Sequence, residues 1–256
     1  CLACRRHGLL LRPLGDVVRE VEAVSAEGMT EVVLLGQTVN SYHDGEAGFA
    51  DLLRAVGRVA GIRRLRFTSP HPNDFSEAVV SAMAEVESVC EHVHLPMQSG
   101  SSGVLKRMLR RYSREGYLEV VRRLRAAIPG LSLTTDIIVG FPGESEEDFA
   151  ETLSAVEAVG FDDAFTFKFS PREGTPATRM RPEESVPDEV ATERLARLMA
   201  LARGMSRRRN LGLLGQRREV LVERVSRRGE LMQARTRDFR TVLIPGDDSM
   251  IGHYRT

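Results

Sequence analysis

The sequence "LSLTTDIIVGFPGESEEDF", residues 131–149, is the clearest guide to the architecture of this chain. It begins with an apolar run rich in β-branched residues, which favours a strand buried on both faces. A turn of glycine and proline follows, and Ser145 with Asp148 then has the spacing of a helix capping box. The stretch therefore predicts a strand, a polar turn and a helix, the repeating unit of a parallel βα sheet.

The same unit recurs along most of the chain. Strands are predicted over residues 30–36, 62–70, 90–96, 131–140 and 163–171. Helices are predicted over residues 15–28, 49–61, 74–86, 101–109, 114–128, 145–160 and 189–215. We expect Asp16 and Gly28 to cap the first of these helices. Five strands alternating with helices indicate an α/β fold whose parallel sheet is either open or closed into a barrel.

The composition is that of an ordinary globular protein. The 256 residues are 42% hydrophobic and 28% charged, enough for one large domain and one small one. No stretch of sequence approaches the ~20 apolar residues of a membrane helix, and no signal peptide is visible. We therefore expect a cytoplasmic protein that does not bind a membrane.

The formal net charge is zero, but the charges are unevenly distributed. Between Arg203 and Arg240 there are twelve arginines and four carboxylates. Arginine suits bidentate phosphate contacts and stacking on bases, which favours an anionic partner. Genomic codon bias and a solvated helix face are the alternative explanations.

Polar segments follow all five predicted strands, where parallel sheets carry their chemistry. They read "GQTVNSY", "TSPHPND", "PMQSGS", "GFPGE" and "SPREGTPA". Turn chemistry explains the glycines and prolines, but a shared polar site better explains the amides, hydroxyls and carboxylates. His92 and His94 share one face of a strand with Cys90, and a satisfied interior pair is favoured there over metal ligation.

The first eight residues, "CLACRRHG", contain a Cys-x-x-Cys pair, Cys1 and Cys4. Three cysteines are too few for a disulfide framework, so the pair indicates a metal or redox site. It precedes the first helix and so falls in the loop after a strand that the chain lacks. We expect the chain to be a fragment that begins inside a functional loop. A zinc site is the alternative, but no second ligand pair follows.

Six segments in order resemble the radical S-adenosylmethionine (SAM) methylthiotransferases. They are "TSPHPND", "CEHVHLPMQSGS", "VLKRMLRRYSREGYLEVVRRLRAAIPG", "TTDIIVGFPGESEEDF", "FDDAFTFKFSPREGTPA" and "RTRDFRTVLIPGD". Together with "LLGQTVNSY", the last is most similar to the tRNA branch, which methylthiolates C2 of isopentenyladenosine beside the anticodon. The resemblance implies a partial (βα)6 TIM-like barrel lacking its first strand over 1–212, followed by an incomplete all-β TRAM domain over 213–256.

The resemblance also implies the cofactors. In the family, three cysteines bind a [4Fe-4S] cluster whose open iron takes SAM, and Cys1 and Cys4 match the last two of the three. The first would lie upstream, and a second [4Fe-4S] cluster would belong to an amino-terminal domain absent from this chain. The loop "RRHGLLLRP" is shorter than the family's usual aromatic-containing loop, which puts cluster binding in question.

The remaining candidate residues fall into two sets. Those expected to bind SAM are Gly36, Gln37, Asn40, Gln98, Ser99 and Asp136. Those expected to bind RNA, by phosphate contacts or by stacking in the case of the phenylalanine, are Arg217, Arg218, Arg235, Arg237, Phe239 and Arg240.

The expected partners are tRNA and an electron donor such as flavodoxin or ferredoxin, and the protein is expected to be a monomer. Two alternatives stay open. One is a methylthiotransferase for threonylcarbamoyladenosine or for a ribosomal protein. The other is a degenerate, non-catalytic RNA-binding remnant.

Overall fold

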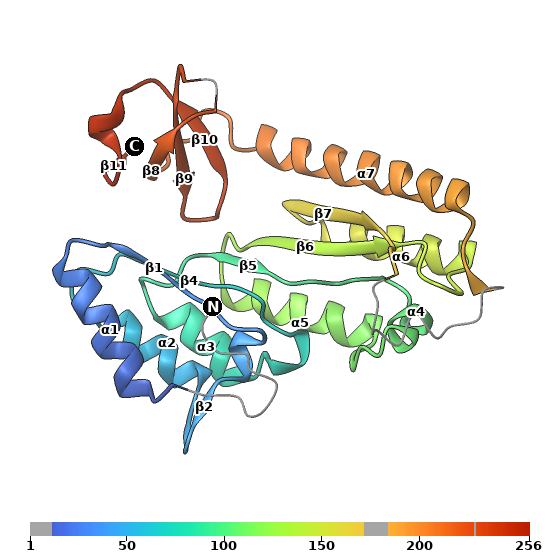
Figure 1. Ribbon diagram of the computed structural model, residues 1–256, viewed down its shortest axis with the longest axis horizontal. Coiled ribbons are helices and arrows are strands. Elements are labelled where there is room, and N and C mark those ends of the chain that lie inside the picture. The colour runs from blue at the N-terminus through green and yellow to red at the C-terminus, as the bar shows by residue number, and fades with distance from the viewer. Residues whose placement is uncertain (1–11, 172–183, 228) are drawn as a thin grey trace.

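The larger part of the computed structural model is built on five parallel strands and the helices that cover them (Figure 1). The structure describes residues 12–171, 184–227 and 229–256. The strands are β1 (Glu31–Leu34), β4 (Arg64–Phe67), β5 (His92–His94), β6 (Ser132–Val139) and β7 (Asp163–Lys168). β1 pairs with β4, β6 pairs with both β5 and β7, and a bridge between Leu65 and Val89 joins the two groups. The predicted α/β fold and all five predicted strands are confirmed.

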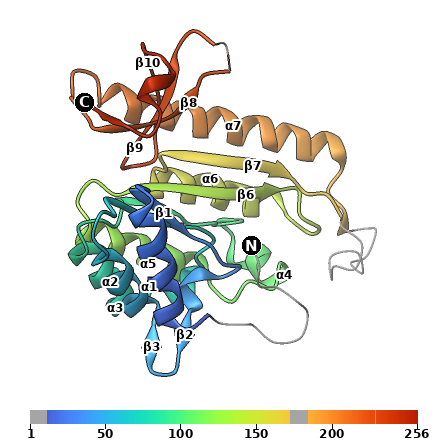
Figure 2. The ribbon, with the colours of Figure 1, turned by 60° about the vertical axis from the view of Figure 1, so that its left-hand side comes forward.

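Helices cover the outer face of this sheet (Figures 1 and 2). They are α1 (Leu14–Ala26), α2 (Phe49–Gly57), α3 (Glu77–Glu85), α4 (Ser102–Arg107), α5 (Arg114–Ala127) and α6 (Glu146–Val159). The core lies between the two layers and includes the fully buried Leu65, Val93, Leu133 and Phe149. The thiol of Cys90 is also buried, near Arg66 and Arg237, and burial raises its pKa to about 11.

The helix ends test the predicted caps. The Ser145–Asp148 capping box is confirmed by both of its hydrogen bonds, at 2.9 and 3.1 Å. Gly28, with a φ of 93°, follows the end of α1 as predicted. The predicted Asp16 cap is wrong, because the helix begins at Leu14 with Pro13 at the N-cap, which places Asp16 in the first turn.

The structure adds elements that the sequence did not predict. A hairpin of β2 (His43–Asp44) and β3 (Ala47–Gly48) precedes α2. Single turns of 3-10 helix, η1 (Val39–Ser41) and η2 (Pro72–Asp74), follow β1 and β4. The two turns lie at the carboxyl ends of their strands, where the polar segments were expected to gather.

A long helix, α7 (Asp188–Leu211), runs beside β7 and leads to a small antiparallel sheet (Figure 1). This C-terminal sheet has the order β10 (Thr241–Ile244), β9 (Met232–Thr236), β8 (Val220–Val225), β11 (Tyr254–Arg255), and η5 (Asp248–Met250) precedes β11. It has its own small core of Val220, Val222, Met232 and Ala234. An all-β structure was expected over residues 213–256, and the division into 1–212 and 213–256 stays a prediction.

Within the described residues, no helix is long and apolar enough to cross a membrane.

Candidate active site

The inner face of the parallel sheet lines a cavity of about 1380 Å³, which we call the lumen. Because side chains alternate along a strand, each strand sends every second residue into it. Val33 comes from β1, Arg66 from β4, His94 from β5, Asp136 from β6 and Phe165 from β7. The C-terminal sheet closes one end of the lumen, so residues far apart in sequence meet around one space.

A chain of hydrogen bonds crosses the centre of the lumen. The Thr134 hydroxyl lies 3.0 Å from His92 Nε2 and 2.9 Å from His94 Nδ1, and His94 Nε2 lies 3.2 Å from the Asp136 carboxylate. If His94 donates to Asp136, its Nδ1 accepts from Thr134, which in turn accepts from His92. Burial and the charge of Arg66 lower the pKa of His92 to about 3, so that ring is neutral at pH 7.

These contacts confirm the predicted interior histidine pair. Across residues 12–171, 184–227 and 229–256, no three His, Cys, Asp or Glu side chains are placed to hold a metal ion. Cys1 and Cys4, the predicted cluster ligands, lie outside the described residues.

At the carboxyl edge of the sheet, Asn40 joins two neighbouring loops. Its side-chain amide donates to the His71 carbonyl at 2.9 Å and accepts from the His71 amide at 2.8 Å. Gly36 packs so closely that a Cβ there would lie 3.1 Å from Val39 Cα, and Gln37 is exposed beside it. The predicted cofactor residues Gly36, Gln37 and Asn40 therefore lie in one loop. The Asn40 amide is already bonded to the His71 backbone.

Gln98 and Ser99 lie at the end of the next strand in a strained turn. Gln98 has a φ of 65° and bonds through its backbone to Asp136 and Ile138 of β6. The Ser99 side chain is fully buried against α6, with its hydroxyl 3.2 Å from that of Thr152. Gln98 thus lies beside Asp136 at the site, whereas the Ser99 side chain faces the helix layer.

The "GFPGE" turn after β6 is held by a buried ion pair. Glu144 accepts from the Gly140 amide at 2.7 Å and from Arg194 of α7 at 2.9 Å. Gly140 has a φ of 72°, and a Cβ there would lie 2.6 Å from Ala191 Cβ. The turn therefore requires glycine and fixes α7 against the carboxyl edge.

The predicted RNA-binding arginines do not form one free basic surface. Arg237 pairs with Glu91 at 3.0 Å and donates to the carbonyls of Glu87, Val89 and Arg63. These partners lie at the amino ends of β4 and β5. Arg237 thus joins the C-terminal sheet to the parallel sheet.

Of the other four predicted RNA-binding arginines, three also pair with carboxylates. Arg240 pairs with Asp162 and Asp238, and Arg218 lies 2.7 Å from the Asp238 carboxylate. Arg235 pairs with Glu223 across the C-terminal sheet, at 3.1 Å. Of the five predicted arginines, Arg217 alone is exposed without an ion-pair partner among the described residues.

Phe239, predicted to stack on RNA, already stacks on a protein ring. Its ring lies 4.5 Å from that of His92 at an interplanar angle of 15°, and the Arg235 guanidinium lies 4.3 Å from its centroid. Its φ of 69° is unusual for a residue other than glycine. The ring thus forms part of the end of the lumen nearest the C-terminal sheet.

Two buried arginines of β4 complete this interface, and sequence reasoning missed them. Arg64 is fully buried and donates to the carbonyls of Arg235 and Glu219 at 2.8 and 3.2 Å. Arg66 donates to the Arg237 carbonyl at 2.7 Å and pairs with Glu31. Alternation in "RRLRF" was the available signal, because it places both arginines on the inner face.

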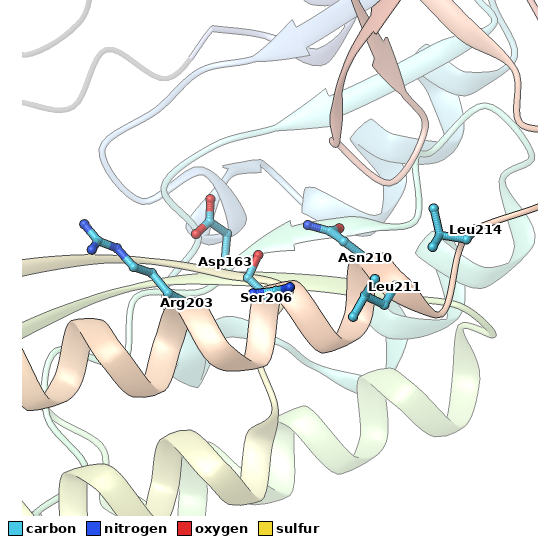
Figure 3. A pocket seen from close by; sticks show the side chains of 7 residues that line it. Asp163, Arg203, Ser206, Asn210, Leu211 and Leu214 are labelled. Carbon is cyan, nitrogen blue, oxygen red and sulfur yellow. The ribbon is translucent and has the colours of Figure 1, made fainter.

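A smaller hollow of about 400 Å³ lies along the end of α7 (Figure 3). Arg203 and Arg207 line it together with the exposed Leu211 and Leu214. Four of its lining residues also line the lumen: Asp163, Ser206, Asn210 and Leu214. The basic end of α7 therefore borders the lumen.

Sequence reasoning also missed the apolar side chains of the lumen. Phe165 lines it, and Phe167 lies two residues further along the same face of β7. The strand reads "DAFTFK", so its alternation carried this signal.

The fold resembles that of known radical SAM enzymes. Coproporphyrinogen III oxidase from Escherichia coli, a radical SAM enzyme, aligns with a TM-score of 0.60 over 88% of this chain and 59% of its own, at 13% identity. A radical SAM methyltransferase from Kitasatospora setae aligns with a TM-score of 0.50 over 61% of this chain and 31% of its own, at 21% identity.

The sequence leads to the same family. The family description "Radical SAM superfamily" matches residues 5–156, more than half of the chain. The chain belongs to the radical SAM superfamily. Membership implies a [4Fe-4S] cluster and SAM.

The chain is also similar to curated proteins named tRNA-2-methylthio-N(6)-dimethylallyladenosine synthase. It is 50% identical to the one from Parafrankia sp. over 98% of this chain and 52% of the relative. The corresponding proteins of Acetivibrio thermocellus and Moorella thermoacetica are 46% and 47% identical over 94% and 93% of this chain, and 51% and 54% of their own lengths. The chain spans about half the length of the curated relatives it matches.

Proposed function

We propose that this chain is the radical SAM and RNA-binding part of a tRNA methylthiotransferase that converts N6-dimethylallyladenosine to its 2-methylthio derivative. The observation that carries this proposal is the 46–50% identity, over nearly the whole chain, to curated relatives of that name. The lumen adds support, because a base must enter an enclosed site for C2 to be reached.

Cys1 and Cys4 would supply two thiolate ligands to the [4Fe-4S] cluster, which with SAM provides the radical chemistry when bound. The described carboxyl edge fits such a group: its backbone approaches closely at Gly36 and takes left-handed conformations at Gln98 and Gly140. We assign SAM contacts to Gly36, Gln37, Gln98 and the backbone around Ser99.

In this proposal Asn40 is a positioning residue that does not contact SAM. Both of its amide atoms bond to the His71 backbone, so it positions the loops after β1 and β4 instead of touching the cofactor. The buried Glu144–Arg194 pair fixes the loop after β6 in the same manner. Rigid loops of this kind hold reacting groups in place and exclude water.

For RNA, we assign a phosphate contact to Arg217. Arg218, Arg235, Arg237 and Arg240 could reach RNA only by sharing or leaving their carboxylate partners. Their first role is to hold the C-terminal sheet, which we assign as a TRAM-type RNA-binding domain. We further propose that the protein is a cytoplasmic monomer that takes electrons from a flavodoxin or ferredoxin, and that a second cluster belongs to a region outside this chain.

The test is complementation of a bacterial strain that lacks its own synthase. Two proteins would be expressed: this chain alone, and this chain joined to the unmatched half of the Moorella relative. Mass spectrometry of the tRNA nucleosides should detect 2-methylthio-N6-dimethylallyladenosine with the joined protein, and Cys4→Ala should abolish it.

Other outcomes of this experiment separate the alternatives. Restoration of a methylthiolated threonylcarbamoyladenosine instead would assign the chain to that branch. An inactive joined protein that still binds tRNA would favour the non-catalytic remnant and overturn the proposal.

A further inference from the structure

Four large apolar side chains are exposed on the inner face of the parallel sheet. Val33 and Phe165 line the lumen and are 41% and 54% exposed. Leu35 and Phe167 lie two residues further along the same faces and are 63% and 51% exposed. Exposed apolar side chains gathered on a concave face typically mark a ligand site.

These side chains lie at the two sides of the lumen, and the polar groups lie between them. β1 and β7 are the first and last of the five parallel strands: Val33 lies in β1, Leu35 directly follows it, and both phenylalanines lie in β7. The strands between them present Arg66, Thr134, His94 and Asp136. The lumen is therefore suited to a ligand that combines a polar ring with an apolar branch.

One carboxylate oxygen of Asp136 has no hydrogen-bond partner among the described residues. Its carboxylate is 31% exposed, and His94, which bonds one oxygen, is its side chain's only partner among the described residues. The Phe165 ring lies edge-on to the His94 ring, with centroids 6.0 Å apart. A ligand N–H donor that enters the lumen can therefore bond Asp136 beside an aromatic surface.

The register of the sheet places the polar and the apolar group side by side. Asp136 of β6 is paired directly with Phe165 of β7, and their side chains point into the same lumen. In N6-dimethylallyladenosine, one atom, N6, carries both an N–H and a five-carbon apolar branch. Such a nitrogen bonded to Asp136 would place its branch against Phe165. A threonylcarbamoyl branch would instead bring a carboxylate toward Asp136, which is unfavourable.

We propose that Asp136 and the apolar side chains of β7 and β1, Phe165 foremost, form the subsite that recognises the N6–H and the dimethylallyl branch of the substrate adenosine. The inference rests on the proposed function and deepens it. It moves Asp136 from the cofactor to the substrate, and it makes Phe165 a specificity-determining residue.

The test is a binding matrix of chain variants against synthetic anticodon stem-loops. The RNAs carry adenosine, N6-methyladenosine, N6,N6-dimethyladenosine or N6-dimethylallyladenosine beside the anticodon. We expect the unaltered chain to bind the dimethylallyl RNA about tenfold more tightly than the unmodified RNA. Phe165→Ala should remove that preference and leave the affinity for unmodified RNA unchanged.

Asp136→Asn tests the polar half of the subsite. An amide can still accept a hydrogen bond but carries no charge, so the preference for N6-methyl over N6,N6-dimethyl RNA should fall severalfold. Leu35→Ala and Leu243→Ala form a matched pair, because both remove an exposed leucine and only Leu35 follows Val33 on the inner side of β1. Only the first should reduce the dimethylallyl preference, and thermal unfolding should confirm that all variants fold.

The outcomes separate the inference from the proposed function. A chain that binds the dimethylallyl RNA and keeps its full preference after Phe165→Ala would overturn the subsite, while the proposed function would stand. An unaltered chain that binds none of the RNAs would overturn both. A preference for a threonylcarbamoyladenosine RNA would overturn the subsite and favour the sibling activity.

Discussion

The two ends of the parallel strands are held in different ways. At the amino ends, guanidinium groups of Arg64, Arg66 and Arg237 bond carboxylates and carbonyls across the junction with the C-terminal sheet. At the carboxyl ends, the loops are bonded to one another and to α7, as where Asn40 bonds His71 and Glu144 pairs with Arg194. A count of arginines therefore does not locate a binding surface, because many of these arginines hold the fold together.

The largest effect is expected from breaking the amino-end junction at Arg64. Arg64→Ala would leave the carbonyls of Arg235 and Glu219 without their donor and weaken the pairing of Glu31. Breaking a buried charged contact from one side typically costs 3–5 kcal/mol, so we expect a loss of about 3 kcal/mol in the free energy of unfolding. Urea denaturation measures it.

Arg58→Ala is the control for that experiment. Arg58 is exposed after α2 and has no ion-pair partner among the described residues, so its loss should change stability by less than about 0.5 kcal/mol. If both variants unfold at the same urea concentration, the amino-end junction does not stabilise the protein.

The carboxyl end is tested by Gly140→Ala. Alanine at this position would have to keep a φ of 72°, and its Cβ would overlap Ala191 of α7. Gly130→Ala is a matched control, since Gly130 has a similar φ of 74° with open space around it. We expect losses of about 3 kcal/mol for Gly140→Ala and about 1 kcal/mol for Gly130→Ala, measured by thermal and urea unfolding. Equal losses would mean that the overlap with α7 does not contribute to the loss of stability.

A third prediction concerns pH and Asp238, which lies between Arg218 and Arg240 at 2.7 and 2.9 Å. Burial raises its pKa, but hydrogen bonds from Thr236 and Arg240 and the two arginine charges outweigh burial, so its pKa lies below the usual value. The stabilisation is therefore complete above about pH 4, the unfolded pKa, and is lost as pH falls through the lower folded pKa.

Asp238→Asn should accordingly cost about 2 kcal/mol at pH 7, and the difference from the unaltered chain should shrink between about pH 4 and pH 2. Urea unfolding at a series of pH values measures both curves. Glu230→Gln removes an exposed carboxylate between β8 and β9, and its curve should follow that of the unaltered chain. A constant Asp238→Asn deficit down to pH 2 would refute the assignment.

The sequence predicted the parallel sheet because its strands are apolar runs and its helices are amphipathic. It could not predict the β2–β3 hairpin, whose two-residue strands are too short to show any period. Nor could it place the C-terminal sheet at the amino ends of β4 and β5. Many bonds of that junction run from guanidinium groups to backbone carbonyls, such as Arg66 to Arg237. Every residue has a carbonyl, so the sequence does not indicate which one is bonded.

The candidate site was predictable in outline only. Polar loops at the carboxyl edge follow from the order of strands and turns, and the structure gathers the first four there, whereas most of "SPREGTPA" lies outside the described residues. What each side chain does depends on its neighbours: the Ser99 hydroxyl lies against α6, and the Asn40 amide bonds the backbone of His71. Phe165 was readable from the alternation of its strand, but its pairing with Asp136 depends on register, which emerges only in the folded sheet.

The last and smallest expected change is in RNA affinity, where the exposed Arg217 is compared with the paired Arg237. Arg217→Gln removes an exposed arginine and should weaken anticodon stem-loop binding about threefold, lower the salt dependence by roughly one phosphate contact and leave stability unchanged. Arg237→Gln removes the partner of Glu91 and should instead reduce the free energy of unfolding by about 2 kcal/mol. Fluorescence anisotropy over a series of salt concentrations, with urea unfolding of the same samples, separates the two effects. If Arg237→Gln lowers RNA affinity at unchanged stability while Arg217→Gln does nothing, the paired arginines bind RNA and the roles assigned to them are reversed.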